Sequence, residues 1–441
     1  MKRFHLIPLI SLTLILLFVG VGLTATPAPL PFLAREIPLA TTRAKESLDA
    51  LAINANNEYL ALWQVDAGNG NIDIWARRAA LRPDFHWLGD AFAVANSDRP
   101  EFAAAAAYDP IKDEFLIVYE YDYSNDDHDV RAQRVAGSAN ASASLLGASL
   151  PVAVTTGFER APNVSFLAAT GQYLVVYEMD GDVWGRRVAR RGEGDQGGDF
   201  LGDEFPIAAE ADREETSPAV AAAENEGYFM VAYNYAFSPA DDDVRAQRVR
   251  GQRQNAEELL GEHFVLADSA DRENAPAIAY SRTVNAFIIL WQVAIPFNYD
   301  VRGVWVDAAN LFDKPIIGKA FDIATDVLAM EAAPAVDVDI VSGEVIAALS
   351  YAEMWGAWSR PAQVWLNADP RSAQRIVRPL QVLPERPFLT QKPRVRLVPG
   401  QNRFLIGYTA RWGTSNTADQ DAYLLMASRS GLSLPLILLR K

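Results

Sequence analysis

Aspartates dominate the residues of this sequence that could do chemistry, and they gather in short polar segments that recur along the chain. Carboxylates are preferred ligands of calcium, which takes about six to eight oxygens. The densest run, residues 122–129, makes Asp126 and Asp127 a candidate calcium site, although the run lacks the spacing of an EF-hand loop. The candidate ligand-binding residues are Asp122, Asp126, Asp127, Asp129, Asp182, Asp242, Asp243 and Asp300.

A recurring aspartate also has a simpler interpretation as a turn residue, whose carboxylate accepts backbone N–H groups next to a strand. Recurring acidic–arginine pairs, such as Glu159–Arg160 and Asp271–Arg272, are in the same way expected to form ion pairs between neighbouring repeats. The sequence leaves both interpretations of the acidic residues open, and it identifies no catalytic residue.

Several classes of enzyme are excluded by missing residues and motifs. The chain has no cysteine, and outside the leader its histidines are His86, His128 and His263, so cysteine-based and histidine-rich metal sites are not expected. It has no G-x-S-x-G elbow, no P-loop and no dinucleotide fingerprint. Two carboxylates could still cleave a glycosidic bond, but so acidic a sequence singles out no pair.

The acidic charge narrows the range of partners. The formal net charge is -16 and the isoelectric point is about 4.8, so the field of the protein repels nucleic acid and anionic lipid. Aromatic residues near the polar segments, among them Phe237 and Tyr299, could stack on sugar rings. We expect a monomer that binds an extracellular protein or a polysaccharide, with no cofactor other than the calcium considered above.

The first 25 residues have the pattern of a signal peptide. Lys2 and Arg3 precede an apolar stretch, residues 6–23, and small residues surround Ala25. The stretch is also long enough for an uncleaved membrane anchor. The pattern predicts a secreted or cell-surface protein, and residues 432–441 form a second hydrophobic segment at the other end of the chain.

Between these segments the sequence repeats. Seven apolar segments bounded by polar residues predict strands buried on both faces, and they begin at Tyr59, Phe115, Tyr173, Phe229, Phe287, Val345 and Phe404. A strand rich in small residues precedes each of the clearest copies, as at 217–223 and 275–281. A third strand follows an acidic turn, as at Asp129 and Asp243, and a fourth follows that, as at 204–210.

Four strands repeated seven times predict an all-β fold, a seven-bladed β-propeller of four-stranded antiparallel blades over residues 35–431. The seventh repeat is too short to supply four strands. The segment 35–42 has the pattern of a fourth strand and is predicted to complete the last blade, which closes the ring and leaves no exposed edge.

The repeating unit carries a family resemblance. The pattern F-L-V-V-W/Y, acidic turn, D-V-R-A-Q-R-V, L-G-x-x-F-x-I-A and S-P-A-V-A resembles a repeat of uncharacterised secreted bacterial β-propeller proteins. Its best copies are residues 115–135, 173–188 and 229–249. The resemblance implies the propeller fold and export, and it implies no catalytic residues.

These observations favour a secreted or cell-surface binding module that uses the acidic loop face around the propeller channel. A carbohydrate-active enzyme with carboxylates on that face is the first alternative, and a structural envelope protein is the second. The two functional classes differ in geometry: an enzyme should gather carboxylates of perturbed pKa in one pocket, whereas a scaffold should spread its acids evenly round the ring.

Overall fold

The seven predicted apolar strands are present, and each is the central, second strand of its own sheet. Successive side chains of these strands point to opposite faces of the sheet, and both faces are buried. Residues such as Leu60, Leu116 and Leu174 have no solvent exposure. These strands are β3 (Glu58–Asp66), β8 (Glu114–Ser124), β12 (Gln172–Met179), β16 (Tyr228–Ser238), β21 (Ala286–Ile295), β25 (Val345–Glu353) and β29 (Arg403–Trp412).

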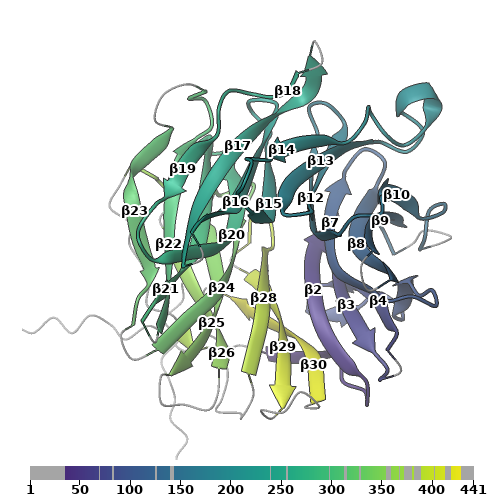
Figure 1. The fold of residues 1–441 in the computed structure, drawn as a ribbon. Coiled ribbons are helices and arrows are strands. Elements are labelled where there is room, and N and C mark those ends of the chain that lie inside the picture. The colour runs from purple at the N-terminus through teal and green to yellow at the C-terminus, as the bar shows by residue number, and fades with distance from the viewer. Residues whose placement is uncertain are drawn as a thin grey trace, which may run out of the picture. The chain divides into compact units, whose positions relative to one another are not determined.

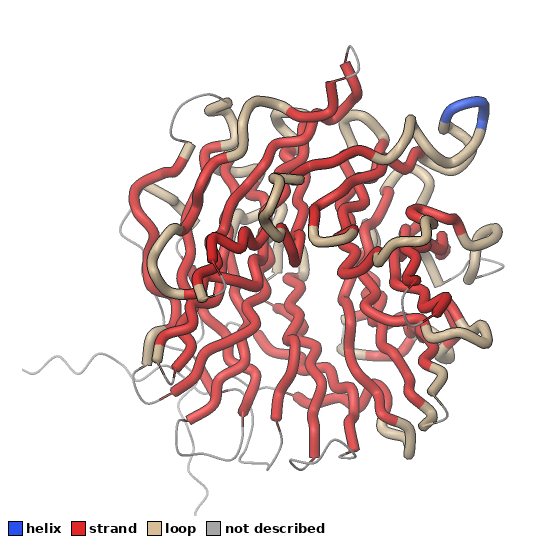
Figure 2. The backbone as a smooth tube through the Cα atoms, viewed as in Figure 1, coloured by secondary structure: helices blue, strands red, loops and turns tan. Residues whose placement is uncertain are grey.

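The computed structural model describes residues 35–428 except 69, 82–83, 125–126, 140–143, 239, 255–256, 297, 312–314, 327–328, 354–358, 367, 372–379, 382–388, 402 and 413–418. The predicted leader (1–25), the C-terminal segment (432–441) and Asp126 therefore lie outside the described residues. Within the described ranges the one helix is a 3-10 turn, Asp195–Gly197 (Figure 2), and none is long and apolar enough to span a membrane.

Each central strand is the second strand of an antiparallel sheet, and there are seven such sheets (Figure 1). The first, inner strands are β2 (Lys45–Ile53), β7 (Glu101–Asp109), β11 (Glu159–Leu167), β15 (Glu215–Ala223), β20 (Arg272–Ser281), β24 (Ala329–Val338) and β28 (Leu389–Leu397). The third strands are β4 (Ile72–Ala80), β9 (Asp127–Ala136), β13 (Asp182–Ala189), β17 (Asp241–Gln254), β22 (Asn298–Asp307), β26 (Ser359–Leu366) and β30 (Asp419–Ser428).

The outer strands are short, and they complete a seven-bladed β-propeller whose blades are numbered here from β2 to β28. They are β6 (Phe92–Ala95), β10 (Leu150–Ala153), β14 (Phe205–Ala208), β19 (Phe264–Ala267), β23 (Ile316–Ala324), β27 (Leu380–Gln381) and β1 (Arg35–Ala40). Blades 1 and 4 each have a fifth strand, β5 (His86–Trp87) and β18 (Glu257–Leu259), beside the same third strand as the outer one.

The hydrophobic core lies between the blades. One buried cluster joins Met230 and Val244 of blade 4 to Phe287 and Val304 of blade 5, and another joins Val118 of blade 2 to blade 3. Side chains on the two faces of a blade thus pack against different neighbours. Because no blade buries its apolar faces alone, the seven blades stabilise one another.

Every inner strand contains a bulge near its start, where it has one residue more than the central strand opposite. In five blades the bulge holds a non-glycine residue at positive φ: Ala103, Ala161, Ser217, Ala275 and Ala333, each between 51° and 55°. Such a conformation is costly for these residues and needs support from the surroundings.

The support comes from the preceding blade. The N–H of Ala161 donates to Oε1 of Glu120 at 2.6 Å, and the N–H of Ser217 donates to Oε1 of Glu178 at the same distance. In β24 the N–H of Ala333 donates to Oε1 of Gln292 at 3.0 Å. These polar side chains occupy equivalent positions on the central strands, so each links its blade to the inner strand of the next blade.

The ring closes as predicted, because β1 pairs with β30 and becomes the outer strand of blade 7. Ile37 and Leu39 of β1 are buried in a cluster with Leu424 of β30 and Leu48 of blade 1. The first residues of the propeller therefore complete the sheet made by its last residues.

This closure predicts the effect of a cavity in β1. The substitution Ile37→Ala removes a buried side chain and should lower the free energy of unfolding by about 2–4 kcal/mol. Chemical denaturation would measure the loss, with Arg35→Ala as the control because Arg35 is exposed on the same strand. Equal stabilities of the two variants would contradict a role for β1 in closure.

Candidate functional site

A buried glutamate stands at the start of the inner strand in six of the seven blades. These residues are Glu46, Glu101, Glu159, Glu215, Glu273 and Glu331, and none is more than 2 % exposed. In each, Oε2 lies away from solvent and has no hydrogen-bond partner among the described residues. Oε1 accepts hydrogen bonds from the preceding connection, as from the N–H of Ser97 to Glu101 and of Asp326 to Glu331.

Each buried glutamate faces the aspartate that begins the third strand of the preceding blade. The predicted residues Asp129, Asp182, Asp243 and Asp300 occupy this one position, opposite Glu159, Glu215, Glu273 and Glu331 in turn. Asp73 and Asp421 complete the set opposite Glu101 and Glu46. The structure therefore joins half of the predicted binding residues to partners that our sequence analysis did not identify.

The carboxylates of Asp129, Asp182 and Asp243 accept no backbone N–H within the described part of the chain. The interpretation of these recurring aspartates as turn residues therefore gains no support from the described residues, and Asp129 Oδ2 accepts a hydrogen bond from Arg131 Nη2 at 3.2 Å. Asp66 does have that role, because it accepts the N–H of Gly68 at 2.8 Å. The physical reason lies in the register: the aspartate side chain points across to the next blade instead of back along its own turn.

Burial and like charge both favour the protonated form of these acids. Burial, with a smaller contribution from the charge of Asp300, raises the pKa of Glu331 to about 8. Burial in the same manner raises the pKa of Glu215 and of Glu273 to about 7, with added contributions from Asp182 and Asp243. Six carboxyl pairs of this kind lie between successive blades.

The junction between blades 6 and 7 differs from the other six. By strand register, Arg360 occupies the aspartate position of β26, and Thr390 occupies the glutamate position of β28. Both acids are replaced together, which supports the view that they act as a pair.

The remaining predicted residues have other surroundings. Asp122 lies on β8 with its carboxylate 3.9 Å from His128 Nε2, and Asp127 begins β9. Asp242 forms an ion pair with Arg272 of blade 5, in which Arg272 Nη2 is 2.7 Å from Asp242 Oδ2. The expectation of ion pairs between blades is thus confirmed for Arg272, whereas Arg160 pairs with Glu178 in its own blade.

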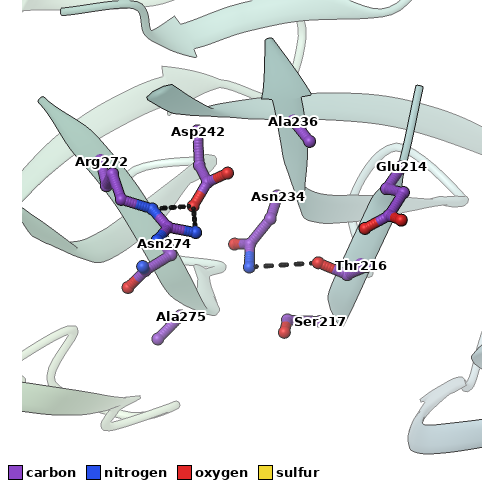
Figure 3. A pocket seen from close by; sticks show the side chains of 9 residues that line it. All are labelled: Glu214, Thr216, Ser217, Asn234, Ala236, Asp242, Arg272, Asn274 and Ala275. Carbon is purple, nitrogen blue, oxygen red and sulfur yellow. Dashed lines mark hydrogen bonds and ion pairs between the residues drawn. The ribbon is translucent and has the colours of Figure 1, made fainter. Parts of the chain in front are cut away.

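A polar pocket of about 350 Å³ opens at the junction of blades 4 and 5 (Figure 3). Its lining residues are Glu214, Thr216, Ser217, Asn234, Ala236, Asp242, Arg272, Asn274 and Ala275. The amide of Asn234 lies between the two walls; its nitrogen is 3.4 Å from Thr216 Oγ1, and its oxygen has no partner among the described residues. The side chain of Asn274 also has no hydrogen-bond partner there.

Two exposed aromatic residues lie in the same two blades, although neither lines the pocket. Phe237 follows the lining residue Ala236 and is 51 % exposed, and Arg213 lies 5.3 Å from the centre of its ring. Tyr299 is 39 % exposed and lies near Arg272, whose pKa is raised by its hydrogen bond to Asp242, by that carboxylate's charge and, less, by Tyr299. Polar groups and exposed rings thus occur in the same two blades.

A second, larger cavity of about 760 Å³ is the channel between the inner strands. All seven blades line it, mostly with small residues such as Ala52, Ala106 and Ala279, and Tyr108 and Tyr280 stand among them. The predicted use of small residues around the central axis is confirmed. Hydrogen-bonding side chains make up a smaller share of the residues that line the channel than of those that line the pocket between blades 4 and 5.

Comparisons with known proteins identify the fold. No protein-family model matches the chain, and no curated protein matches its sequence significantly. Among solved structures, a protein of unknown function from Dyadobacter fermentans is similar at TM-score 0.51 with 7% identity, over 90% of this chain and 99% of that one. The polysaccharide lyase Uly1 is similar at 0.52 with 10% identity, over 87% and 90%.

A third structure, the Cps50 (Swd1) β-propeller domain of Myceliophteria thermophila, has TM-score 0.48 and 9% identity over 90% of this chain and 99% of that one. At these identities the similarities concern the fold alone. The two similarities with TM-scores above 0.5 support the overall fold described above.

The buried acids predict how stability depends on pH. A carboxyl whose pKa is higher in the folded state than in the unfolded state holds a proton on folding, so stability falls as pH rises between the two values. We expect the free energy of unfolding to decrease from pH 5 to pH 8. The substitution Glu331→Gln should reduce that decrease by a few kcal/mol, because the amide mimics the protonated acid.

Denaturation at a series of pH values would measure this dependence. Glu262→Gln is the matched control, since Glu262 is exposed and makes no contact that would be lost. A pH dependence that is the same in the Glu331→Gln variant and in the unmodified protein would contradict the assignment.

Proposed function

We propose that this protein is an exported binding module that recognises a neutral saccharide in the pocket between blades 4 and 5. The propeller fold supports an interaction module in general. The observation that carries the finer proposal is a polar pocket in which the side-chain oxygen of Asn234 and the amide of Asn274 have no hydrogen-bond partner among the described residues.

The chemistry of the lining groups matches that of sugars. An amide side chain offers both donors and acceptors, as sugar hydroxyl groups require, and Thr216 and Ser217 add hydroxyl groups of their own. Aromatic rings provide flat apolar faces for the C–H groups of a sugar ring. The net charge of -16 disfavours anionic ligands, so an uncharged saccharide suits the pocket better than a phosphorylated one.

The distribution of the acids favours binding over catalysis. The Asp–Glu pairs recur at six junctions round the ring instead of gathering in one pocket, which is the arrangement expected of a scaffold. In the pocket itself, Asp242 is committed to Arg272. The leader pattern of residues 1–25 supports the exported location.

Calorimetry with cello-, xylo-, manno- and laminari-hexaose tests the proposal. At least one of them should bind, and Asn234→Ala and Asn274→Ala should each weaken that binding about tenfold, since each removes hydrogen bonds worth about 1.4 kcal/mol. Asn225→Ala is the matched control, because Asn225 bonds to the Arg282 carbonyl outside this pocket.

Three results would contradict the proposal. The first is a lack of binding to any of the four sugars, which would favour a protein partner or a structural role. The second is binding that neither pocket variant weakens. The third is release of new reducing ends from the bound sugar, which would favour the carbohydrate-active enzyme.

A further inference from the structure

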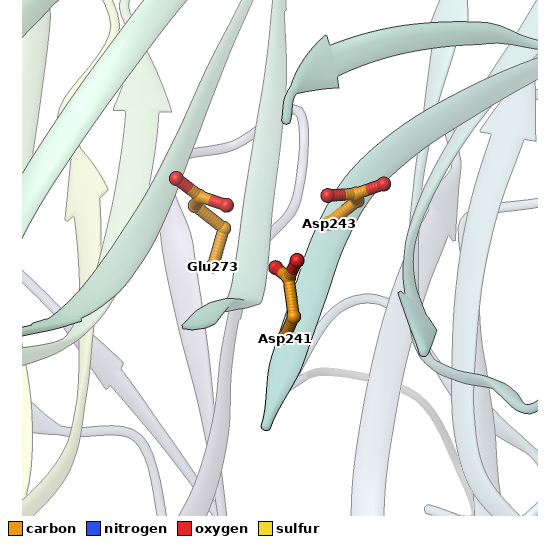
Figure 4. A group of neighbouring side chains, drawn as sticks. All are labelled: Asp241, Asp243 and Glu273. Carbon is orange, nitrogen blue, oxygen red and sulfur yellow. The ribbon is translucent and has the colours of Figure 1, made fainter. Parts of the chain in front are cut away.

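Three carboxylates converge at the junction of blades 4 and 5. Asp241 and Asp243 lie two residues apart on β17 and so share one face of the strand, and Glu273 reaches them from β20 of the next blade (Figure 4). One oxygen of each side chain lies within 4.8 Å of the other two. Among the described residues, this is the group of acids close enough to share an ion.

The oxygens that face this space are unpartnered and inaccessible to solvent. Glu273 is 1 % exposed; the Ser269 hydroxyl donates to its Oε1, and its Oε2 has no hydrogen-bond partner. Oδ1 of Asp241 is buried without a partner as well. A buried polar atom with no partner is costly. All six glutamates share an unpaired Oε2, but here two buried, unpaired oxygens belong to one group of three close carboxylates, and this indicates a missing positive ligand.

The nearby arginines supply only part of that positive charge, since burial and Asp241 keep the pKa of Asp243 raised although Arg245 lowers it. Arg245 Nη1 lies 3.1 Å from Glu210 Oε1, and its guanidinium is 3.3 Å from the centre of the Tyr235 ring. Arg272 binds Asp242, whose side chain lines the pocket. Both cations are engaged outside the group of three acids.

We propose that Asp241, Asp243 and Glu273 bind one calcium ion, which links blade 4 to blade 5. Calcium–oxygen distances are about 2.4 Å, so ligands of one ion lie at most about 4.8 Å apart. The three carboxylates meet this limit, and water supplies the remaining ligands. Calcium suits the site better than magnesium, because it accepts irregular geometry and bidentate carboxylates.

The other junctions have an Asp–Glu pair, and the residue two before that aspartate varies. Asp127 and Asp419 are acidic there as well, but among the described residues only Asp241, Asp243 and Glu273 bring three carboxylates within 4.8 Å of one another. Asn71 and Asn298 put a neutral amide at the position of Asp241. Asp180 occupies it in blade 3, but its Oδ1 accepts the N–H of Phe158 at 3.2 Å. The junction of blades 4 and 5 is therefore the one to which we assign the ion.

This inference goes beyond the proposed function and does not depend on it, because calcium binding is measured without a sugar. The experiment is isothermal titration of the metal-free chain with calcium chloride, followed by thermal unfolding with calcium and with a chelator. We expect one ion per chain and a higher unfolding midpoint with calcium.

Variants locate the ion. Asp241→Asn and Glu273→Gln should each weaken calcium binding at least tenfold. Asp180→Asn and Glu215→Gln, the matched changes at the junction of blades 3 and 4, should leave it unchanged. Circular dichroism of the metal-free variants checks that each one folds.

Three outcomes would overturn the assignment. They are no heat of binding at millimolar calcium, binding that survives both Asp241→Asn and Glu273→Gln in folded protein, and a magnesium affinity above that for calcium. A loss of sugar binding with intact calcium binding would count against the proposed function alone.

Discussion

The hydrogen bond between one blade's central strand and the bulge of the next inner strand is the interaction on which the rest of the structure depends. It holds residues such as Ala161 and Ser217 at positive φ, which they would not adopt unaided. The bulge in turn sets the register of the two residues before it. Burial of the glutamates, the contact between facing acids and the position of the pocket walls all follow from that register.

The acid pairs show how a repeated fold can tolerate groups that would be destabilising singly. Two carboxylic groups in contact need not both be charged, and burial of Glu215 and Glu331 favours the neutral form. Where a third carboxylate lies close to the pair, as Asp241 does beside Asp243 and Glu273, one shared proton leaves two negative charges in the group. Asp127, Asp180 and Asp419 stand at the same position at other junctions, so what distinguishes this junction is how closely its three carboxylates approach one another.

The fold was predictable from the sequence because strand patterns are local. The central strands repeat at nearly constant intervals, and the strand at 35–42 has the same pattern as the other outer strands, so both the blade number and the closure followed. The site was predicted only in part. Asp129, Asp182, Asp243 and Asp300 were singled out by their recurrence, but their partners lie in the next blade, some thirty residues away.

A signal for those partners was present in the sequence. Glu159, Glu215, Glu273 and Glu331 each stand three residues before a proline, in the segments ERAP, ETSP, ENAP and EAAP. The pocket had a weaker signal, because Asn234 shares the polar position of Glu120, Glu178 and Gln292 on the central strands but an asparagine recurs neither there nor at the position of Asn274. Only the side-by-side placement of two blades brings them together.

Closure of the ring by β1 has a consequence for the order of folding. Arg35 pairs with Met426, so the last blade joins residues from opposite ends of the propeller sequence. Contacts between residues so far apart form slowly, since the intervening chain must first be ordered. Blades near the middle of the chain can assemble while it is still being synthesised, whereas blade 7 forms only after the strands of β29 and β30 have been made.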